Sequence, residues 1–495
     1  MSLVKGLWCT DCGRRVPLSM KHVSCPTCGG VLQVQYDFQA IAEKLSRETL
    51  SHRGIGVWRY RELLPIQNIG DVVSLGEGGT YLHKCRGLAE QTSLQHLYLK
   101  DETINPTGSF IDRGMAVELS MVRQARISRV CCASVGNMAV SLVAYAARAG
   151  LAARVLMAKH GGVDMGKFYQ VLAYGADVET VRDPAAAERS LQFHRRHCHP
   201  VASTNPFFLE GIKTTILEVC EQMDWSMPDW VIVPMGSGGH ISQIWKGILE
   251  LRELGLCDGD NPHLVGVQSK SCSPIVTSFE HGRTDVAPCT RASVIARDIG
   301  VAAPRCGRSA VKAIRESGGT ALAVADGDII DAVRRLARFE GVFAEPSSAT
   351  VIAGLDILTA DGTLDSNDTI VCMVTGMGLK SPEVTRELLR DHRGLQRLLR
   401  AIEGRKFTGD LGRTKKRILE ILSDGEEYGY MIWKRLSMEY GIRIKIPSVY
   451  QHLAELRAAG LVELTRTERT YQGRTRNYYA LSDRGTRIVS ERPLE

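Results

Sequence analysis

The chain has 495 residues, of which 44% are hydrophobic and 24% charged, a composition typical of a globular protein that folds in water. This length exceeds what one hydrophobic core usually holds, so we expect several modules. No apolar run approaches the roughly 20 residues that span a bilayer, and the N-terminus lacks a signal-peptide pattern, so we expect neither a membrane protein nor a secreted one.

The net charge of +7 is unevenly distributed along the chain. Residues 413–495 carry 16 Lys and Arg against 11 Asp and Glu, whereas the much longer remainder carries 46 against 44. A small basic module therefore follows a large, nearly neutral one, as expected where only the tail meets a polyanion. The fourteen cysteines include the adjacent Cys131 and Cys132 inside an apolar run. Buried thiols of this kind suit a reducing compartment, and we expect a cytoplasmic protein.

Residues 1–38 hold two Cys-x-x-Cys pairs, Cys9 with Cys12 and Cys25 with Cys28. Four thiolates at this spacing can surround one zinc ion tetrahedrally and leave no open position. We therefore predict a zinc ribbon whose metal is structural and stabilises a segment too small to fold alone. The alternative, a set of unrelated free or disulfide-bonded cysteines, is uncommon in a reducing compartment.

Residues 57–389 alternate short apolar runs with amphipathic stretches, the pattern of a parallel sheet with crossover helices. The clearest predicted elements are the strands 129–134, 154–158 and 230–235 and the helix 136–149. The last of these strands runs directly into a glycine loop, Gly236, Ser237, Gly238, Gly239 and His240, which an amphipathic helix follows. Backbone N–H groups bared by glycine at a helix N-terminus can bind a phosphate. A tight strand-to-helix turn also needs glycine, so the loop alone leaves both interpretations open.

Several further segments accompany this loop in a fixed order, including Gly76–Thr80, Asn105–Arg113, Ser134–Asn137, Glu345–Ala349 and Thr375–Lys380. This succession resembles the threonine synthases, which are pyridoxal-phosphate (PLP) enzymes of the tryptophan-synthase-β-like fold. Some microbial threonine synthases also open with a similar ribbon. The resemblance implies an α/β fold class, with a two-domain body of PLP fold type II between the N-terminal zinc ribbon and the tail.

The resemblance also implies which residues contact the cofactor and the ligand. Asn137 would contact the phenolic side of PLP, Thr375 would hydrogen-bond its pyridine nitrogen, and the glycine loop would hold its phosphate. A hydroxyl at position 375 would leave the ring neutral, a weaker electron sink than a pyridinium paired with a carboxylate. The pocket for an amino-acid-like ligand would be lined by Thr80, Thr107, Ser109, Ser134 and Phe208.

The chain departs from this family at the residue that carries the chemistry. Ile111 stands where threonine synthases have the lysine that binds PLP covalently, and isoleucine has no nitrogen with which to hold the cofactor or return a proton. Phe208 replaces an arginine thought to clamp the substrate's phosphate, and Ile212 replaces a glutamine. His240 stands where asparagine is common. We therefore expect no catalytic residue in this pocket and a PLP that binds non-covalently.

Residues 390–412 are predicted to be a linker and residues 413–495 a winged helix-turn-helix domain. The pattern predicts helices at 413–422, 430–440 and 447–459, then a hairpin of strands 461–467 and 476–481 and a short last helix. Three helices followed by a hairpin, together with the phrases Tyr428-Gly429-Tyr430 and Ser448-Val449-Tyr450, resemble the PadR-like regulators. The resemblance implies that this domain binds DNA.

Two groups of residues are the candidate DNA contacts. The third helix would present Ser448, Tyr450, Gln451 and His452 to base edges. The wing would present Arg466, Arg469, Arg474 and Arg476 to phosphates or to the minor groove. Such folds also serve as dimerisation or docking modules in which the arginines are only solvated, and a salt-dependent DNA affinity separates the two interpretations.

The sequence thus favours a transcriptional regulator in which a catalytically degenerate, threonine synthase-like body senses PLP, an amino acid or their adduct and controls DNA binding by the winged helix. Because helix-turn-helix proteins read paired half-sites, we expect a homodimer. The alternative is an active PLP-dependent, threonine synthase-like lyase that uses another lysine. Lys100 and Lys213 are the candidates for that lysine, and both also fit ordinary structural positions.

Overall fold

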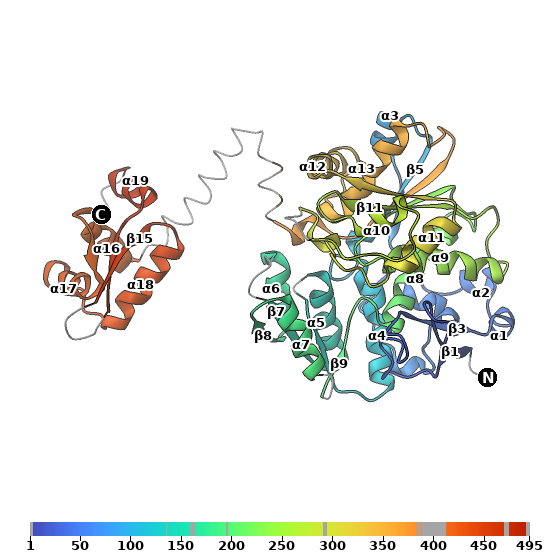
Figure 1. The fold of residues 1–495 in the computed structure, drawn as a ribbon, viewed down its shortest axis with the longest axis horizontal. Helices are drawn as coiled ribbons and strands as arrows, with labels where there is room; N and C mark the ends of the chain where they lie inside the picture. Colours follow the sequence, from blue (N-terminus) through green and yellow to red (C-terminus); the bar gives the residue numbers. More distant parts are fainter. Residues whose placement is uncertain are drawn as a thin grey trace. The chain divides into compact units, whose positions relative to one another are not determined.

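The structure, a computed structural model, describes residues 3–134, 136–158, 164–194, 197–290, 295–382, 384, 388, 412–469 and 475–491. The chain forms two compact units, Met1–Leu388 and Leu389–Glu495 (Figure 1). Residues 390–411, nearly all of the predicted linker, lie outside the described residues. Among the described helices, none is long and apolar enough to cross a membrane.

The first unit begins with a three-stranded antiparallel sheet in the order β2-β1-β3. Its elements are β1 Val4–Cys9, β2 Arg15–Val16 and β3 Leu32–Tyr36, followed by α1 Phe38–Ala42 and α2 Arg47–Ser51. The Tyr36 hydroxyl donates to Glu210 Oε2 at 3.0 Å, and Lys246 Nζ donates to the backbone oxygen of Val34 at 2.9 Å. These bonds tie the ribbon to two helices of the α/β body, within one compact unit.

The larger sheet of the body has six strands in the order β12-β11-β10-β13-β5-β4, parallel except for β4. Its strands are β4 Tyr81–Lys84, β5 His96–Asp101, β10 Trp230–Pro234, β11 His263–Ser269, β12 Thr320–Val324 and β13 Thr369–Val374. The helices that connect these strands or pack beside them are α3 Gly87–Thr92, α8 Pro206–Gln222, α9 Gly239–Glu253, α10 Pro274–Glu280, α11 Gly307–Glu316, α12 Asp326–Arg335 and α13 Pro346–Ala360. Val231, Ile232 and Val233 of the central strand β10 are fully buried, which explains the continuous apolar run in the sequence.

The smaller sheet has four parallel strands in the order β8-β7-β6-β9. Its elements are β6 Arg129–Cys132, β7 Ala152–Ala158, β8 Asp177–Val181 and β9 His199–Pro200, with helices α4 Ile111–Gln124, α5 Asn137–Ala149, α6 Met165–Ala173 and α7 Pro184–His194. Figure 1 shows β7 and β8 grouped with α5, α6 and α7, apart from β5, β11 and α13 of the larger layer. Short 3-10 or π-helical turns complete the unit: η1 Val57–Leu63, η2 Ile69–Asp71, η3 Glu102–Ile104, η4 Arg297–Ile299, η5 Leu336–Glu340 and η6 Gly378–Lys380.

The expectation that both cysteines at the end of β6 are free thiols is wrong for one of them. Cys131 forms a disulfide with Cys198, whereas Cys132 is a buried free thiol. The two residues are far apart in the sequence, so spacing alone gave no sign that they pair.

Helices α4 and α8 cross at two glycines that allow a very close approach. A Cβ at Gly114 would lie 2.5 Å from the Phe208 ring, and one at Gly211 would lie 2.2 Å from the backbone oxygen of Arg113. Any larger residue at either position would push the helices apart. The crossing brings Ile111, at the start of α4, and Phe208, in the first turn of α8, to the same region of the body.

A buried ion network joins β5 and the turn η3 to the two helices α4 and α8. The fully buried Arg113 donates to Glu102 through Nε at 2.6 Å and Nη2 at 2.7 Å, and to Glu218 through Nη1 at 2.9 Å. Lys100 Nζ lies 2.6 Å from Glu218 Oε1. Two cations therefore face two carboxylates, which is the balance that makes buried charge tolerable.

In its described residues, the second unit contains four helices and a three-stranded antiparallel sheet in the order β14-β16-β15. Its elements are α16 Arg413–Ser423, β14 Glu427–Tyr428, α17 Gly429–Tyr440, α18 Ile446–Ala458, β15 Val462–Arg469, β16 Thr475–Leu481 and α19 Asp483–Glu491. Each of the first three helices buries an apolar face in one core, to which Ile418, Ile432 and Leu453 belong. The predicted elements agree with these bounds within two residues, apart from the turn of the hairpin at 470–474, which lies outside the described residues.

Replacing Glu218 by Ala should destabilise the protein strongly, because Arg113 and Lys100 would be left with one buried carboxylate between them. We expect the free energy of unfolding to fall by about 3–5 kcal/mol, measured by denaturant unfolding of the full chain. The matched control is Asp177→Ala, which breaks the exposed pair between Asp177 and Arg154 and should cost less than about 1 kcal/mol. Equal effects of the two variants would contradict a stabilising role for the buried network.

Candidate functional site

A cavity of about 460 Å³ lies in the first unit, where the carboxyl ends of β6, β10 and β13 meet the starts of α4, α5, α9 and α13. Ligands of α/β proteins usually bind at such strand ends. The lining therefore comes from both α/β layers. It includes Ser109, Phe110, Ile111, Ser134, Asn137, Phe208, Ile212, Gly236, Ser237, Gly238, Gly239, His240, Asp298, Glu345, Ser347 and Thr375.

The structure brings together all the residues expected to contact the cofactor, since each of them lines this cavity. Among the residues expected to contact the ligand, Ser109, Ser134 and Phe208 line it as well. Thr80 and Thr107, which were also expected to contact the ligand, do not belong to the lining of the described cavity. Thr80 donates to Glu102 and Thr107 to Asp112, each at 2.7 Å, so their hydroxyls stabilise the buried scaffold instead.

The two residues that follow Ile111 fix the direction of its side chain. Asp112 is buried and accepts hydrogen bonds from the backbone N–H and the hydroxyl of Thr107, both at 2.7 Å. Arg113 is held in the buried ion network. Successive helical side chains point about 100° apart. With residues 112 and 113 anchored in the interior, Ile111 is left on the cavity wall.

The loop before α9 has the geometry of an anion cradle. Gly238 has a φ of +86°, and a Cβ there would lie 2.8 Å from the Cβ of Ala310, so only glycine fits. The first N–H groups of α9 have no acceptor within the helix, and Gly239 and His240, which carry them, line the cavity. Donors at a positive helix terminus favour a phosphate. The loop therefore fits the phosphate of PLP.

Four buried polar atoms on the wall have no hydrogen-bond partner among the described residues: Asn137 Oδ1, Ser347 Oγ, His240 Nδ1 and Glu345 Oε1, of which the last lies 3.0 Å from Lys167 Nζ. The amide nitrogen of Asn137 donates to Glu345 Oε2 at 3.0 Å, so only its oxygen is left for a ligand. Thr375 Oγ1 shares a hydrogen bond of 2.9 Å with Ser348 Oγ. A buried polar atom without a partner costs about 1–3 kcal/mol, so such atoms are usually satisfied by a ligand or water. Asn137 Oδ1 and Thr375 Oγ1 fit the polar substituents of the PLP ring.

Sequence patterns did not reveal a charged cluster beside the cavity. Lys167 Nζ, on α6, lies 2.6 Å from Asp298, 3.0 Å from Glu345 and 3.1 Å from Asp164. Burial opposes the charge of Lys167, but the three carboxylates together raise its pKa. Burial, followed by the charge of Asp298, raises the pKa of Glu345 from 4.5 to about 7. Asp298 lies in a segment without a motif, so only the tertiary structure places it here.

His240 adds no positive charge to the glycine loop. Its ring stacks on Phe110, with ring centroids 4.3 Å apart. Burial lowers the pKa of His240 from 6.5 to about 4, because a charged imidazolium would lose its hydration in this site. The imidazole is therefore neutral at neutral pH.

Neither candidate for a replacement lysine belongs to the cavity lining. Lys100 is held by Glu218 at 2.6 Å and by the backbone oxygen of Thr80 at 2.8 Å. Lys213 is held by Glu210 at 2.5 Å and Glu250 at 2.6 Å. No lysine occurs among the described residues that line the cavity.

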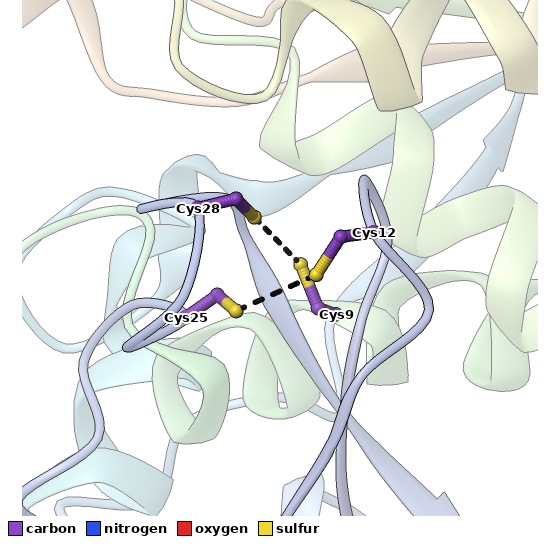
Figure 2. Close-up of side chains that lie close together, drawn as sticks. All are labelled: Cys9, Cys12, Cys25 and Cys28. Atoms are coloured by element: carbon purple, nitrogen blue, oxygen red, sulfur yellow. Dashed lines mark hydrogen bonds between the residues drawn. The ribbon is translucent and has the colours of Figure 1, made fainter.

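The four cysteines of the ribbon point toward one another in Figure 2. Their Sγ atoms all lie within 4.8 Å of one another, with Cys9 3.5 Å from Cys28 and Cys12 3.7 Å from Cys25. Backbone hydrogen bonds lower the pKa of Cys25 to about 6, whereas burial raises the pKa of Cys9 to about 12. Four converging thiol groups are compatible with a tetrahedral zinc ion.

In the second unit, the residues expected to read base edges lie on α18. Tyr450 and Gln451 are exposed, whereas Ser448 and His452 are half-buried. Gln451 Nε2 donates to Glu455 Oε1 at 3.1 Å, a bond on the helix surface that DNA could displace. Tyr450 also packs closely on the start of α17, since a Cβ at Gly429 would lie 2.5 Å from its ring.

The arginines of the wing differ in their surroundings. Arg466, in β15, lies 2.8 Å from Glu426 and stacks on the Tyr478 ring, so its charge is already partly compensated. Arg476, in β16, lies over the Tyr428 ring and is exposed. Arg469 ends β15, and Arg474 lies outside the described residues.

Two protein-family models match the chain. Residues 73–376, more than half of the chain, match the model described as pyridoxal-phosphate dependent enzyme. Residues 418–491 match the transcriptional regulator PadR-like family.

Curated relatives are threonine synthases. The chain is 42% identical to threonine synthase of Methanocaldococcus jannaschii over 76% of this chain and 93% of that protein. It is 38% identical to the enzyme of Methanosarcina acetivorans over 76% of this chain and 92% of that protein. Against the enzyme of Mycobacterium tuberculosis strain H37Rv it is 37% identical over 66% of this chain and 88% of that protein.

Solved structures resemble the body in fold. The processed form of threonine deaminase isoform 2 from Solanum lycopersicum matches with a TM-score of 0.55 and 20% identity, over 68% of this chain and 95% of that chain. Maize serine racemase matches with a TM-score of 0.53 and 20% identity, over 63% of this chain and 92% of that chain. These likenesses confirm the predicted α/β body of PLP fold type II and, at this identity, show the fold alone.

The raised pKa of Glu345 predicts a pH dependence of stability. Between pH 4.5 and about 7 the folded state holds a proton that the unfolded state releases. Stability should therefore fall as pH rises through this window, by at most about 1.4 kcal/mol per pH unit, and level off above it. The difference in unfolding free energy between the native chain and Glu345→Gln, measured at several pH values, isolates this contribution. If the difference in unfolding free energy between the two proteins does not change with pH, the raised pKa of Glu345 is contradicted.

Proposed function

Because the chain belongs to the threonine synthase family of PLP-dependent enzymes and carries a PadR-like region, we propose that it is a transcriptional regulator. Its body senses PLP, an amino acid or their adduct, and the winged helix binds DNA according to what the body holds. The observation that carries the proposal is Ile111 on the cavity wall, in the one place from which α4 could present an amine to a bound cofactor.

The residues around the cavity support binding more than turnover. PLP, when bound, supplies an aldehyde that reacts with amines and a ring that withdraws electrons. The glycine loop would hold its phosphate, and Asn137 and Thr375 would hold the ring. Isoleucine at position 111 cannot tether the cofactor or move a proton at the ligand's α-carbon. A cavity with these groups can bind and release, as a sensor must.

The second unit would bind the DNA. It is basic, with 16 Lys and Arg against 11 Asp and Glu in residues 413–495, and its α18 and wing are the candidate contacts with DNA. A homodimer would place two copies of α18 on paired half-sites. A protein of this kind would act in the cytoplasm, and zinc held by the four ribbon cysteines would be structural.

The second candidate function is an active PLP-dependent lyase related to threonine synthase. The relatives at 37–42% identity are named threonine synthase. In addition, Lys167 is a buried lysine in contact with Asp298 and Glu345, which line the cavity. Lys167 would have to leave three carboxylates before its amine could react, and charged amines do not attack aldehydes. We therefore rank this function second.

Borohydride reduction of the full chain with PLP distinguishes the two functions. We expect peptide mapping by mass spectrometry to find no PLP-modified lysine in the native chain, and dialysis to remove the cofactor. The matched control is Ile111→Lys, which places an amine on the cavity wall and should yield a modified peptide containing residue 111. A modified Lys167, or any other modified lysine in the native chain, would favour the enzyme.

The regulator should bind DNA with an affinity that depends steeply on salt, measured by fluorescence anisotropy with a duplex enriched from a random pool by the full chain. Each phosphate contact contributes about −0.9 to the slope of log affinity against log salt, so Arg476→Ala should make the slope shallower by about 1. Arg154→Ala, an exposed arginine of the first unit, is the matched control and should leave the slope unchanged. If no duplex shows salt-sensitive binding, the proposal that the winged helix binds DNA is wrong.

A further inference from the structure

One wall of the cavity is apolar, and two packed helices supply it. Ile111 opens α4, and Phe208 and Ile212 lie four residues apart on α8, which puts them on one face of that helix. Phe208 and Ile212 are 1% and 2% exposed, and Ile111 packs against the same hydrophobic cluster. With Gly114 and Gly211 holding the helices together, these side chains form one continuous apolar surface on the cavity.

The carboxylates on the rest of the wall are paired with cations, and Lys167 lies 2.6–3.1 Å from each of the three. Asp164, Asp298 and Glu345 line the cavity, and Arg297 is the one Lys or Arg side chain among its described lining residues. Arg297 is already paired with Asp164 at 2.9 Å. An anionic substituent on a ligand would therefore find no unpaired cation among the described lining residues outside the glycine loop.

The polar groups that remain suit the invariant part of an amino acid. Ser134 lines the cavity just before α5, and its Oγ accepts a hydrogen bond from the N–H of Gly136 at 3.2 Å, so its proton is free to be donated. Ser347 Oγ is buried on the wall without a partner among the described residues. These two hydroxyls can bind a carboxylate and an ammonium group, while the side chain faces the apolar wall.

We propose that the ligand sensed by this cavity is an amino acid with an uncharged apolar side chain, aliphatic or aromatic, lying against Ile111, Phe208 and Ile212. This inference rests on the proposed function, which places an amino acid in the cavity. Each buried methylene strengthens binding about fourfold. A hydroxyl on this wall loses its hydrogen bonds to water and finds none in return, and a phosphate loses its hydration without gaining an unpaired cation.

Calorimetric titration of the full chain, saturated with PLP, tests the class of ligand. The probes are L-leucine, L-phenylalanine, L-alanine, L-threonine and O-phospho-L-serine. We expect leucine to bind about 10–60-fold more tightly than alanine, from three added carbons at about fourfold each, and threonine and O-phosphoserine to bind more weakly than leucine. Threonine or O-phosphoserine binding as tightly as leucine, or no binding of any amino acid, would overturn the proposal.

Variants of the wall test its placement. Ile111→Ala enlarges the space beside the apolar wall without adding a polar atom, and should shift the ratio of phenylalanine to leucine affinity toward phenylalanine by about fivefold or more. Phe208→Arg with Ile212→Gln makes the wall polar and should reverse the order of leucine and O-phosphoserine. Ile216→Val, one turn further along α8 and buried outside the cavity, should leave every ratio unchanged. If the double variant does not fold, Ile111→Ala alone tests the proposal. An unchanged ratio of phenylalanine to leucine affinity in Ile111→Ala would contradict the placement of the ligand's side chain against this wall.

The titration contains no DNA, so its outcome is independent of the regulatory proposal. If leucine binds tightly but DNA affinity does not respond to it, the regulatory function fails and the ligand class stands. If DNA affinity responds only to a hydroxylated or phosphorylated amino acid, the ligand class fails and the regulatory function stands.

Discussion

Buried charges immediately after residue 111 decide what that residue can do. Asp112 accepts from Thr107 and from the Ser141 hydroxyl at 2.5 Å, and Arg113 is held by two carboxylates. Turning residue 111 away from the cavity would rotate the start of α4 and unpair at least one of these groups, at a cost of about 3–5 kcal/mol. The scaffold therefore presents whatever side chain stands at 111 to the cavity. In this chain it presents methyl groups where an amine would give covalent chemistry.

The cavity is also where the two α/β layers can be held together by a ligand. Ile111 and Asn137 come from helices beside the smaller sheet, whereas the glycine loop follows β10 of the larger one. A ligand that contacts both layers stabilises the conformation in which the layers are close together. The size of this stabilisation equals the difference between the ligand's binding free energies for the two conformations. A difference of about 1–3 kcal/mol corresponds to a change of about 5–150-fold in a linked affinity. A change of this size in a linked affinity therefore needs no catalytic step.

Local features of the site could be predicted from the sequence, and features made by distant residues could not. The glycine loop, the starts of α5 and α9 and the four ribbon cysteines depend on short-range chemistry, and each lies where it was expected. Thr80 and Thr107 belong to family-like segments, yet their hydroxyls are taken by buried carboxylates. Lys167 and Asp298 are 131 residues apart and meet only in the folded chain. No periodicity or motif reports that meeting.

The apolar side chains at 111, 208 and 212 are physically coupled. A charged lysine at 111 would lie beside Phe208 and Ile212, lose its hydration and gain no partner from either, so its amine would be driven toward the neutral form. That form could still react with an aldehyde, but an anionic substituent on the substrate would meet the same apolar wall. Conversely, a polar residue at 208 or 212 facing isoleucine would lack a partner. Each of the three residues makes the other two more favourable, so a single polar replacement among them would face an apolar wall without a partner.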